Sequence, residues 1–131
     1  MSDDVTTVAV LRDAVRRFAD DRLWEPFHSP KNLSMGLAVE AAELMEHFLW
    51  VDCDASRKVV ADPKWLGEVT DEVADVACHL FNLTNALGID LSKAVENKIA
   101  KNALKYPVDK CSGRFRVEEA SESGGRASDE E

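Results

Sequence analysis

Apolar residues between positions 66 and 87 recur at alternating steps of three and four along the chain. They are Leu66, Val69, Val73, Val76, Leu80, Leu83 and Leu87. This spacing puts apolar side chains on one face of an α-helix at every turn, as in helices that pack in a bundle. A second seam of this kind is formed by Leu33, Leu37, Ala41, Leu44, Phe48 and Val51. No segment alternates apolar and polar residues over a useful length, so the sequence predicts an all-α fold without a sheet.

Start and stop signals divide the chain into four helices. We expect the first helix over residues 5–22, with Asp3 or Asp4 as its N-cap. A loop with two prolines, Pro26 and Pro30, should separate it from a second helix over residues 33–51. Residues 52–61 should then form a polar connection.

The third and fourth helices have stronger boundary signals. The pair Asp62-Pro63 is typical of an N-cap followed by the first helical residue, and Gly88 is a natural helix stop. The fourth helix should be capped by Asp90 or Ser92 and should end before Pro107.

Two pairs of carboxylates lie beside the two seams. Glu40 and Glu43 are three residues apart in the second helix, and Glu72 and Asp75 are three apart in the third, so each pair shares one helical face. Like charges at this spacing destabilise a helix by roughly 0.2–0.5 kcal/mol per pair. A charged row beside a seam is most often a solvated face of a bundle. Two such rows favour another interpretation, in which four converging carboxylates bind a hard cation such as Mg²⁺.

Length and charge restrict the class of protein. A chain of 131 residues is long enough for one domain with a single core. The net charge of −9 argues against a nucleic-acid polymer as partner, because such binding needs basic surface, but it does not exclude a nucleotide. The three cysteines share no CxxC spacing, so neither a disulfide framework nor a zinc site is indicated. Without a membrane span or a leader pattern, the protein is expected to be soluble and cytoplasmic.

The C-terminal end differs in composition from the rest. Residues 118–131 contain six acidic residues and one Arg, and no large apolar side chain. Such a stretch cannot bury enough apolar surface to fold. We therefore expect one domain over residues 1–110 and a disordered acidic tail over residues 111–131.

Four elements of the chain, in order, resemble the MazG-like family of all-α nucleoside triphosphate pyrophosphohydrolases. They are the stretch from Arg22 to Leu33, Glu40-x-x-Glu43, Glu72-x-x-Asp75 after 28 intervening residues, and Asn102-Ala103-Leu104-Lys105-Tyr106-Pro107. The resemblance covers about residues 5–107, and the first element is similar to the dCTP-preferring branch. The fuller family pattern often has Glu at the position of Val39, and members of the dCTP type share this departure.

This resemblance implies a fold, a reaction and a cofactor. The fold would be a four-helix bundle completed by oligomerisation, as a homotetramer built from two dimers that share their nucleotide pockets. The reaction would be attack of water on the α-phosphorus of a nucleoside triphosphate, here dCTP or a modified dCTP, giving the monophosphate and pyrophosphate in nucleotide-pool cleansing. The cofactor would be Mg²⁺, with Mn²⁺ as a substitute. Glu40, Glu43, Glu72 and Asp75 would be both metal ligands and catalytic residues.

The remaining site residues concern the substrate. Trp24, His28 and Trp50 are expected to contact the base, because aromatic faces stack on bases and a His can hydrogen-bond to a base edge. The resemblance favours phosphate or sugar contacts for Lys31, Asn102, Lys105 and Tyr106. His79 is expected to contact a phosphate or to support the carboxylates.

Aromatic residues also bear on packing. We expect Phe18, Phe48 and Trp65 in the core. A lone chain of four helices would leave Trp50 and Phe81 underpacked, which a second copy of the chain could correct.

Two other classes of protein fit parts of the pattern. A ferritin-like di-iron site also uses carboxylates on a four-helix bundle, but it needs Glu-x-x-His on two helices. Here His47 and His79 each follow an acid by four residues, which disfavours that class. A non-catalytic helical adaptor is the second alternative, and it predicts no dependence on divalent metal.

Overall fold

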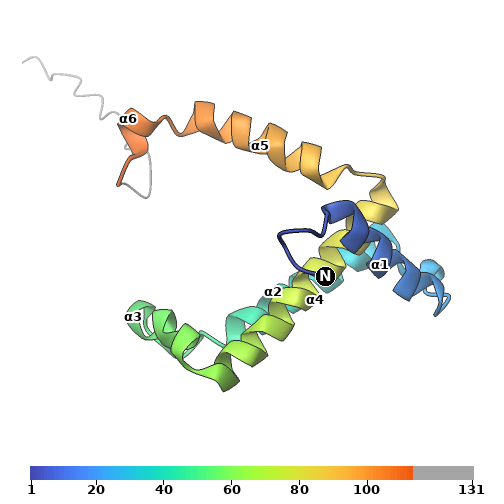
Figure 1. Cartoon of the computed structure of the whole chain (residues 1–131), viewed down its shortest axis with the longest axis horizontal. Helices are drawn as coiled ribbons and strands as arrows, with labels where there is room; N and C mark the ends of the chain where they lie inside the picture. The colour runs from blue at the N-terminus through green and yellow to red at the C-terminus, as the bar shows by residue number, and fades with distance from the viewer. Residues whose placement is uncertain (114–131) are drawn as a thin grey trace, which may run out of the picture. The chain divides into compact units, whose positions relative to one another are not determined.

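The computed structural model describes residues 1–113, which form helices and no strand. The all-α prediction is therefore confirmed. The helices are α1 (Val8–Asp20), η1 (Glu25–Phe27), α2 (Pro30–Glu46), α3 (Cys53–Ser56), η2 (Arg57–Ala61), α4 (Pro63–Leu87), α5 (Leu91–Lys105) and α6 (Val108–Cys111) (Figure 1).

The chain divides into two compact units, residues 1–92 and residues 93–131. The first unit holds α1 to α4 and the first residues of α5; the second holds the rest of α5 and α6. The tail predicted to be disordered falls mainly on residues 114–131, which lie outside the described residues, and its first residue, Cys111, belongs to α6.

The predicted bounds of the first two helices are wrong. α1 begins at Val8 because the Thr7 hydroxyl accepts the N–H of Val10 and caps the helix, so the expected caps at Asp3 and Asp4 are not used. α2 begins at Pro30, since Ser29 caps it by accepting the N–H of Asn32 and proline suits the first helical position. It ends at Glu46, after which residues 47–50 form turns.

The third predicted helix is confirmed as α4. The Asp62 carboxylate accepts the N–H groups of Lys64 and Trp65, both at 3.0 Å, directly before Pro63. Gly88 ends the helix in the left-handed region, with φ of 63°. The connection before α4 is more ordered than expected, because α3 and η2 occupy residues 53–61.

Two interhelical contacts organise the first unit. α2 packs along α4, and α1 packs against α4 (Figure 1). The second contact is fixed by Arg12, which donates to the Asn85 side-chain oxygen at 3.1 Å and to the Thr84 carbonyl at 3.3 Å, while Asn85 donates back to the Arg12 carbonyl at 2.9 Å. The N-terminal half of α1 is therefore held to the C-terminal end of α4.

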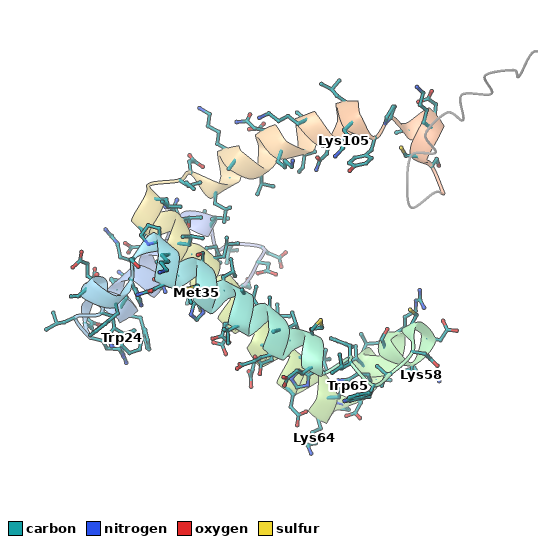
Figure 2. The ribbon with its side chains drawn as sticks, turned by 180° about the vertical axis from the view of Figure 1, so that it is seen from behind. Trp24, Met35, Lys58, Lys64, Trp65 and Lys105 are labelled. Carbon is teal, nitrogen blue, oxygen red and sulfur yellow. The ribbon has the colours of Figure 1, made fainter. Side chains whose placement is uncertain are left out.

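The described part of the chain has a very small core. Its buried residues are Ala19, Leu33 and Thr84, each with a small exposed fraction. The expected burial of Phe18 is wrong, because that ring is 51% exposed, whereas Phe48 and Trp65 are partly buried and contact each other with ring centroids 5.6 Å apart. Trp24 and Trp65 mark opposite ends of the α2–α4 pair (Figure 2).

α2 also has an exposed apolar stripe that the predicted seams did not include. It is formed by Met35, Ala38, Ala42 and Met45, again at steps of three and four, and exposed Leu49 continues the spacing in the turns after the helix. Because Leu33 and Leu37 lie on the less exposed side of the same helix, this stripe is on the opposite side. α2 thus has apolar residues on two faces, and the chain itself covers one of them.

No helix among residues 1–113 is both long and apolar enough to cross a membrane.

Candidate metal and nucleotide site

Three of the four predicted carboxylates converge in the contact between α2 and α4. Oxygen atoms of Glu40, Glu43 and Glu72 all lie within 4.8 Å of one another. Asp75 follows Glu72 by one helical turn and is exposed, outside that group of three. The acidic residues of α2 and α4 therefore do not all lie on a solvated face, because some of them are part of the contact between the two helices.

Two histidines lie near carboxylates of the opposite helix: His79 belongs to α4, and His47 directly follows the last residue of α2. The Nδ1 atom of His79 is 3.7 Å from Oε1 of Glu40, and Nε2 of His47 is 3.9 Å from Oε1 of Glu72. His79 Nδ1 also lies 3.2 Å from the carbonyl of Asp75. These crossed pairs show that α2 and α4 run antiparallel. The sequence shows that each histidine follows an acidic residue by four positions. It does not show that each histidine contacts an acidic residue of the other helix.

The electrostatics of this cluster favour a bound cation. Burial raises the pKa of Glu40, His79 opposes that effect, and the carboxylates of Glu43, Asp75 and Glu72 raise the pKa further. Oε2 of Glu72 is buried and finds no hydrogen-bond donor within residues 1–113. A buried anionic oxygen without a partner is costly, and a metal ion would satisfy it.

Gly36 allows the two helices to approach at the cluster. A Cβ atom at Gly36 would lie 2.7 Å from Cδ2 and 2.8 Å from Nε2 of His79. Such distances are shorter than carbon contacts permit. The absent side chain at Gly36 therefore makes room for the ring that pairs with Glu40, one turn farther along α2.

Gly36→Ala and Gly67→Ala form a matched pair that tests this packing. Gly→Ala in a helix normally stabilises it by about 0.5–1 kcal/mol, and we expect that gain for Gly67→Ala, where an added Cβ meets nothing within 4 Å. Gly36→Ala should be less stable than Gly67→Ala by about 1–3 kcal/mol, because the His79 ring or the helix must move. Urea unfolding of the metal-free protein measures both, and equal gains would contradict the close approach.

An aromatic cavity of about 420 Å³ adjoins the carboxylates. Asp75, Cys78, His79 and Asn82 of α4 form one side of it. Val15 and Phe18 of α1, with Trp24 and His28 from the segment after α1, are among the residues of the other side. Four predicted site residues, Trp24, His28, Asp75 and His79, therefore share one cavity, and Phe18 and Asn82 are cavity residues that the sequence did not identify.

The aromatic side of this cavity is built from two successive ring contacts and one cation–π contact. The Phe18 and Trp24 rings are 5.9 Å apart, and the Trp24 and His28 rings are 6.0 Å apart, both edge to face. The Arg22 guanidinium lies 3.5 Å from the centre of the Phe18 ring. Leu23 has a positive φ of 55°, and this left-handed residue directs the chain so that the Trp24 N–H reaches the Ala19 carbonyl at 3.1 Å. A local backbone strain thus positions Trp24.

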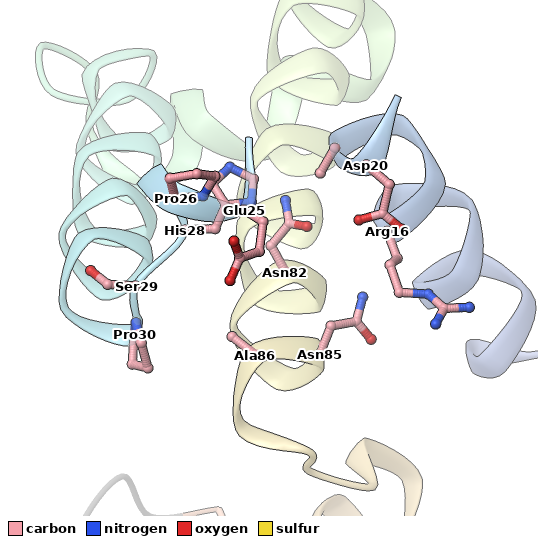
Figure 3. Close-up of a pocket in the computed structure, with 11 residues that line it drawn as sticks. Arg16, Asp20, Glu25, Pro26, His28, Ser29, Pro30, Asn82, Asn85 and Ala86 are labelled. Carbon is pink, nitrogen blue, oxygen red and sulfur yellow. The ribbon is translucent and has the colours of Figure 1, made fainter. Parts of the chain in front are cut away.

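Figure 3 shows a second, polar cavity of about 490 Å³. The two cavities share Ala19, His28 and Asn82. The polar side chains that distinguish the second one are Arg16, Asp20, Glu25, Ser29 and Asn85. A ligand in the aromatic cavity would therefore have one edge toward the opening of this polar cavity.

Other predicted substrate residues lie outside the aromatic cavity. Lys31 is exposed in the first turn of α2, and Trp50, 91% exposed, projects from the turns after that helix. Asn102, Lys105 and Tyr106 belong to the second unit, where the Tyr106 N–H bonds to the Asn102 carbonyl at 2.8 Å and Lys105 Nζ lies 5.2 Å from the Tyr106 ring centre. Roles for these five residues stay predictions.

Comparison with known proteins gives a consistent family. Residues 36–116 match the model of the MazG-like family. The chain is 34% identical over 102 residues to dCTP pyrophosphatase 1 of Rattus norvegicus, covering 78% of this chain and 60% of that protein. The human protein of the same name is 33% identical over 101 residues, covering 77% and 59%. The chain thus spans about 60% of the length of the curated relatives it matches.

A solved structure is similar as well. The crystal structure of a pyrophosphatase from Archaeoglobus fulgidus is 41% identical, with a TM-score of 0.69, over 74% of this chain and 89% of that one.

Proposed function

The chain belongs to the MazG-like family, and from that premise we propose that it is a Mg²⁺-dependent nucleoside triphosphate pyrophosphohydrolase. Its substrate would be dCTP or a modified dCTP, and its products the monophosphate and pyrophosphate. The names of its relatives, dCTP pyrophosphatase 1 and a pyrophosphatase, support this reaction.

One observation carries the proposal: an aromatic cavity begins where the carboxylate cluster ends. Asp75 and His79 line the cavity, and both are among the charged neighbours that shift the pKa of Glu40. A metal–triphosphate bound at the carboxylates would therefore place its nucleoside beside Trp24 and His28. An adaptor protein would not need an aromatic cavity at this position.

Glu40, Glu43 and Glu72 would hold the cation, and Asp75 is the proposed fourth ligand. The Glu72 oxygen that has no donor in the described part of the chain fits this assignment, as does the raised pKa of Glu40. A bound Mg²⁺ would offset the phosphate charge and make a water molecule easier to deprotonate. Mn²⁺ accepts the same oxygen ligands.

The protein's own groups position the reactants. In the proposed reaction the water oxygen forms a bond to the α-phosphorus while the bond from that phosphorus to the bridging oxygen breaks, and pyrophosphate leaves with the electron pair. A carboxylate of the cluster accepts the proton of the water. The aromatic cavity holds the nucleoside, so that the α-phosphate is presented to the cluster in one orientation. Lys31, Asn102, Lys105 and Tyr106 are proposed contacts for the phosphates and sugar.

We propose a homo-oligomer, a homotetramer by resemblance to the family. The exposed stripe on α2 and the very small core of the described residues support self-association. A partner copy could bring Trp50 or the basic residues of its second unit to the pocket.

Product analysis tests the reaction. Incubation of the protein with dCTP and Mg²⁺ in ¹⁸O-labelled water should give dCMP and pyrophosphate, with the label in the phosphate of dCMP. Label in pyrophosphate would indicate attack at the β-phosphorus, and dCDP with inorganic phosphate would contradict the proposed reaction. A thermal shift that requires both Mg²⁺ and nucleotide would separate the enzyme from a helical adaptor.

Base stacking gives a further prediction. Trp24→Ala should raise the KM for dCTP by about 10- to 100-fold with little change in kcat, since removing one stacking ring costs ~1–3 kcal/mol. Phe27→Ala is the control, because Phe27 is an exposed neighbour outside the cavity lining. dCTP should also be a better substrate than dATP or dGTP. If purine triphosphates are hydrolysed best, the assignment of Trp24 and His28 to a cytosine site is wrong.

A further inference from the structure

The polar cavity contains a carboxylate and an amide that the fold does not use. Glu25 of η1 and Asn82 of α4 project into this cavity from facing elements (Figure 3). Within residues 1–113, the side chain of neither forms a hydrogen bond or an ion pair. Their neighbours are engaged elsewhere: Arg16 pairs with Asp13, Asn85 bonds with Arg12, and Ser29 caps α2.

Asn82 lies at the end of the aromatic cavity away from the carboxylate cluster. It follows Asp75 by seven residues, which corresponds to about 10 Å along a helix. A nucleotide with its phosphates at the cluster extends along α4 in this direction. Its base, stacked beside Trp24, would then point its hydrogen-bonding edge at Asn82 and into the polar cavity, where Glu25 lies.

The two groups differ in what they can recognise. An ionised carboxylate only accepts hydrogen bonds, whereas an amide offers a donor and an acceptor and can turn to exchange them. Cytosine presents an amino donor beside the N3 acceptor, so the amino group can donate to Glu25 while Asn82 donates to N3. Uracil and thymine present a carbonyl oxygen in place of the amino group, and Glu25 cannot donate to it. Asn82 adapts to either base, and Glu25 does not.

We infer that Glu25 is a specificity-determining residue, which with Asn82 selects a pyrimidine that bears an amino group over one that bears a carbonyl at the same position. The inference rests on the proposed function for the orientation of the nucleotide. It deepens that function by assigning the choice of base to two side chains outside the metal cluster. Arg16 does not cancel the charge of Glu25, because it is paired with Asp13.

Binding of non-hydrolysable analogues tests this assignment independently of turnover. The affinities of the α,β-imido analogues of dCTP and dUTP would be measured by calorimetry in the presence of Mg²⁺, for the full chain and for the variants Glu25→Gln, Asn82→Ala and Asp20→Asn. The unaltered protein should prefer the dCTP analogue by about 10- to 100-fold. Glu25→Gln should reduce that ratio by about tenfold, because its amide can donate to the uracil carbonyl. Asn82→Ala should weaken the binding of both analogues.

Asp20→Asn is the matched control, since it removes the same charge from the same cavity. It should leave the ratio unchanged. An unchanged ratio in Glu25→Gln, or an equal change in Asp20→Asn, would overturn the role of Glu25. Preferential binding of the dCTP analogue without any hydrolysis of dCTP would reject the proposed reaction and leave the base selection intact.

Discussion

Glu72→Gln is expected to lower kcat for dCTP by at least about 10³-fold, a larger loss than the roughly 10- to 100-fold typical of residues that only support a metal ligand. Oε2 of Glu72 is buried and has no hydrogen-bond donor within residues 1–113, and the carboxylate of Glu72 lies with those of Glu40 and Glu43. Glutamine keeps the shape of the side chain but lacks the charge that would hold the proposed cation. Steady-state release of pyrophosphate at saturating Mg²⁺ measures the effect.

Glu40→Gln tests the same cluster through stability. Because burial and neighbouring carboxylates raise the pKa of Glu40 above its ordinary value of 4.5, the stability that this group contributes is present below pH 4.5 and is lost as the pH rises through the raised pKa. At pH 7 the ionised group therefore destabilises the metal-free fold. Glu40→Gln should raise the melting temperature of the metal-free protein at pH 7, and this gain should shrink toward pH 4.5.

With added Mg²⁺ and nucleotide, the unaltered protein should have a higher melting temperature than Glu40→Gln, the reverse of the order expected without metal. The melting temperature of the unaltered protein should rise with Mg²⁺ and nucleotide, whereas that of Glu40→Gln should change little, since it binds the cation poorly. Glu46→Gln, on the same helix and outside the cluster, is the control and should behave as the unaltered protein. A Glu72→Gln or Glu40→Gln protein with full activity would rule out a metal site here.

The second large effect is expected for Met45→Glu. Met45 is 57% exposed in the apolar stripe of α2, and a second copy that covers the stripe would bury it. Full burial of a Met side chain is worth about 1.5–3 kcal/mol, and an unpaired carboxylate in its place would cost more. Each copy would present this position, so we expect dissociation to monomers and loss of cooperative unfolding at micromolar concentration. Light scattering and urea unfolding measure these two results.

Thr70→Glu is the matched control for charge. Thr70 is an exposed polar residue of α4, and the variant adds the same charge outside the stripe. It should leave the oligomeric state unchanged. A Met45→Glu protein that keeps the mass and stability of the unaltered protein would show that this face of α2 is no interface between copies.

The sequence predicted α4 well because both of its ends are local signals. Asp62-Pro63 and Gly88 specify their caps without help from the rest of the chain. The predicted position of α2 was shifted toward the C-terminus for two reasons. The helix starts at a serine followed by a proline, a pair that is also typical of a loop, and the apolar spacing of its seam continues to Val51 although the helix ends at Glu46. Periodicity alone does not show where hydrogen bonding stops.

The carboxylate cluster of Glu40, Glu43 and Glu72 was predictable only as far as the helical face on which each acid lies. Spacing places Glu40 with Glu43 and Glu72 with Asp75, but it cannot show which acids converge across the helix contact, because that depends on the relative position of two helices. Glu25 and Asn82 have no pattern of their own. They are single polar residues in separate elements, and only the packing of α1, η1 and α4 brings them to one cavity.

The crossed histidine contacts have a consequence for how the site tolerates change in chain length. The Glu40–His79 and Glu72–His47 contacts both depend on the same alignment of α2 with α4. One residue inserted in α2 between Glu40 and His47 would rotate the residues after it by about 100° around the helix axis. The His47–Glu72 contact would then be lost, while the Glu40–His79 contact would remain. A residue inserted in the segment 52–61 would leave both engaged. The number of residues between the two acidic motifs can therefore vary through the connecting segment, whereas the spacing of residues within each helix cannot.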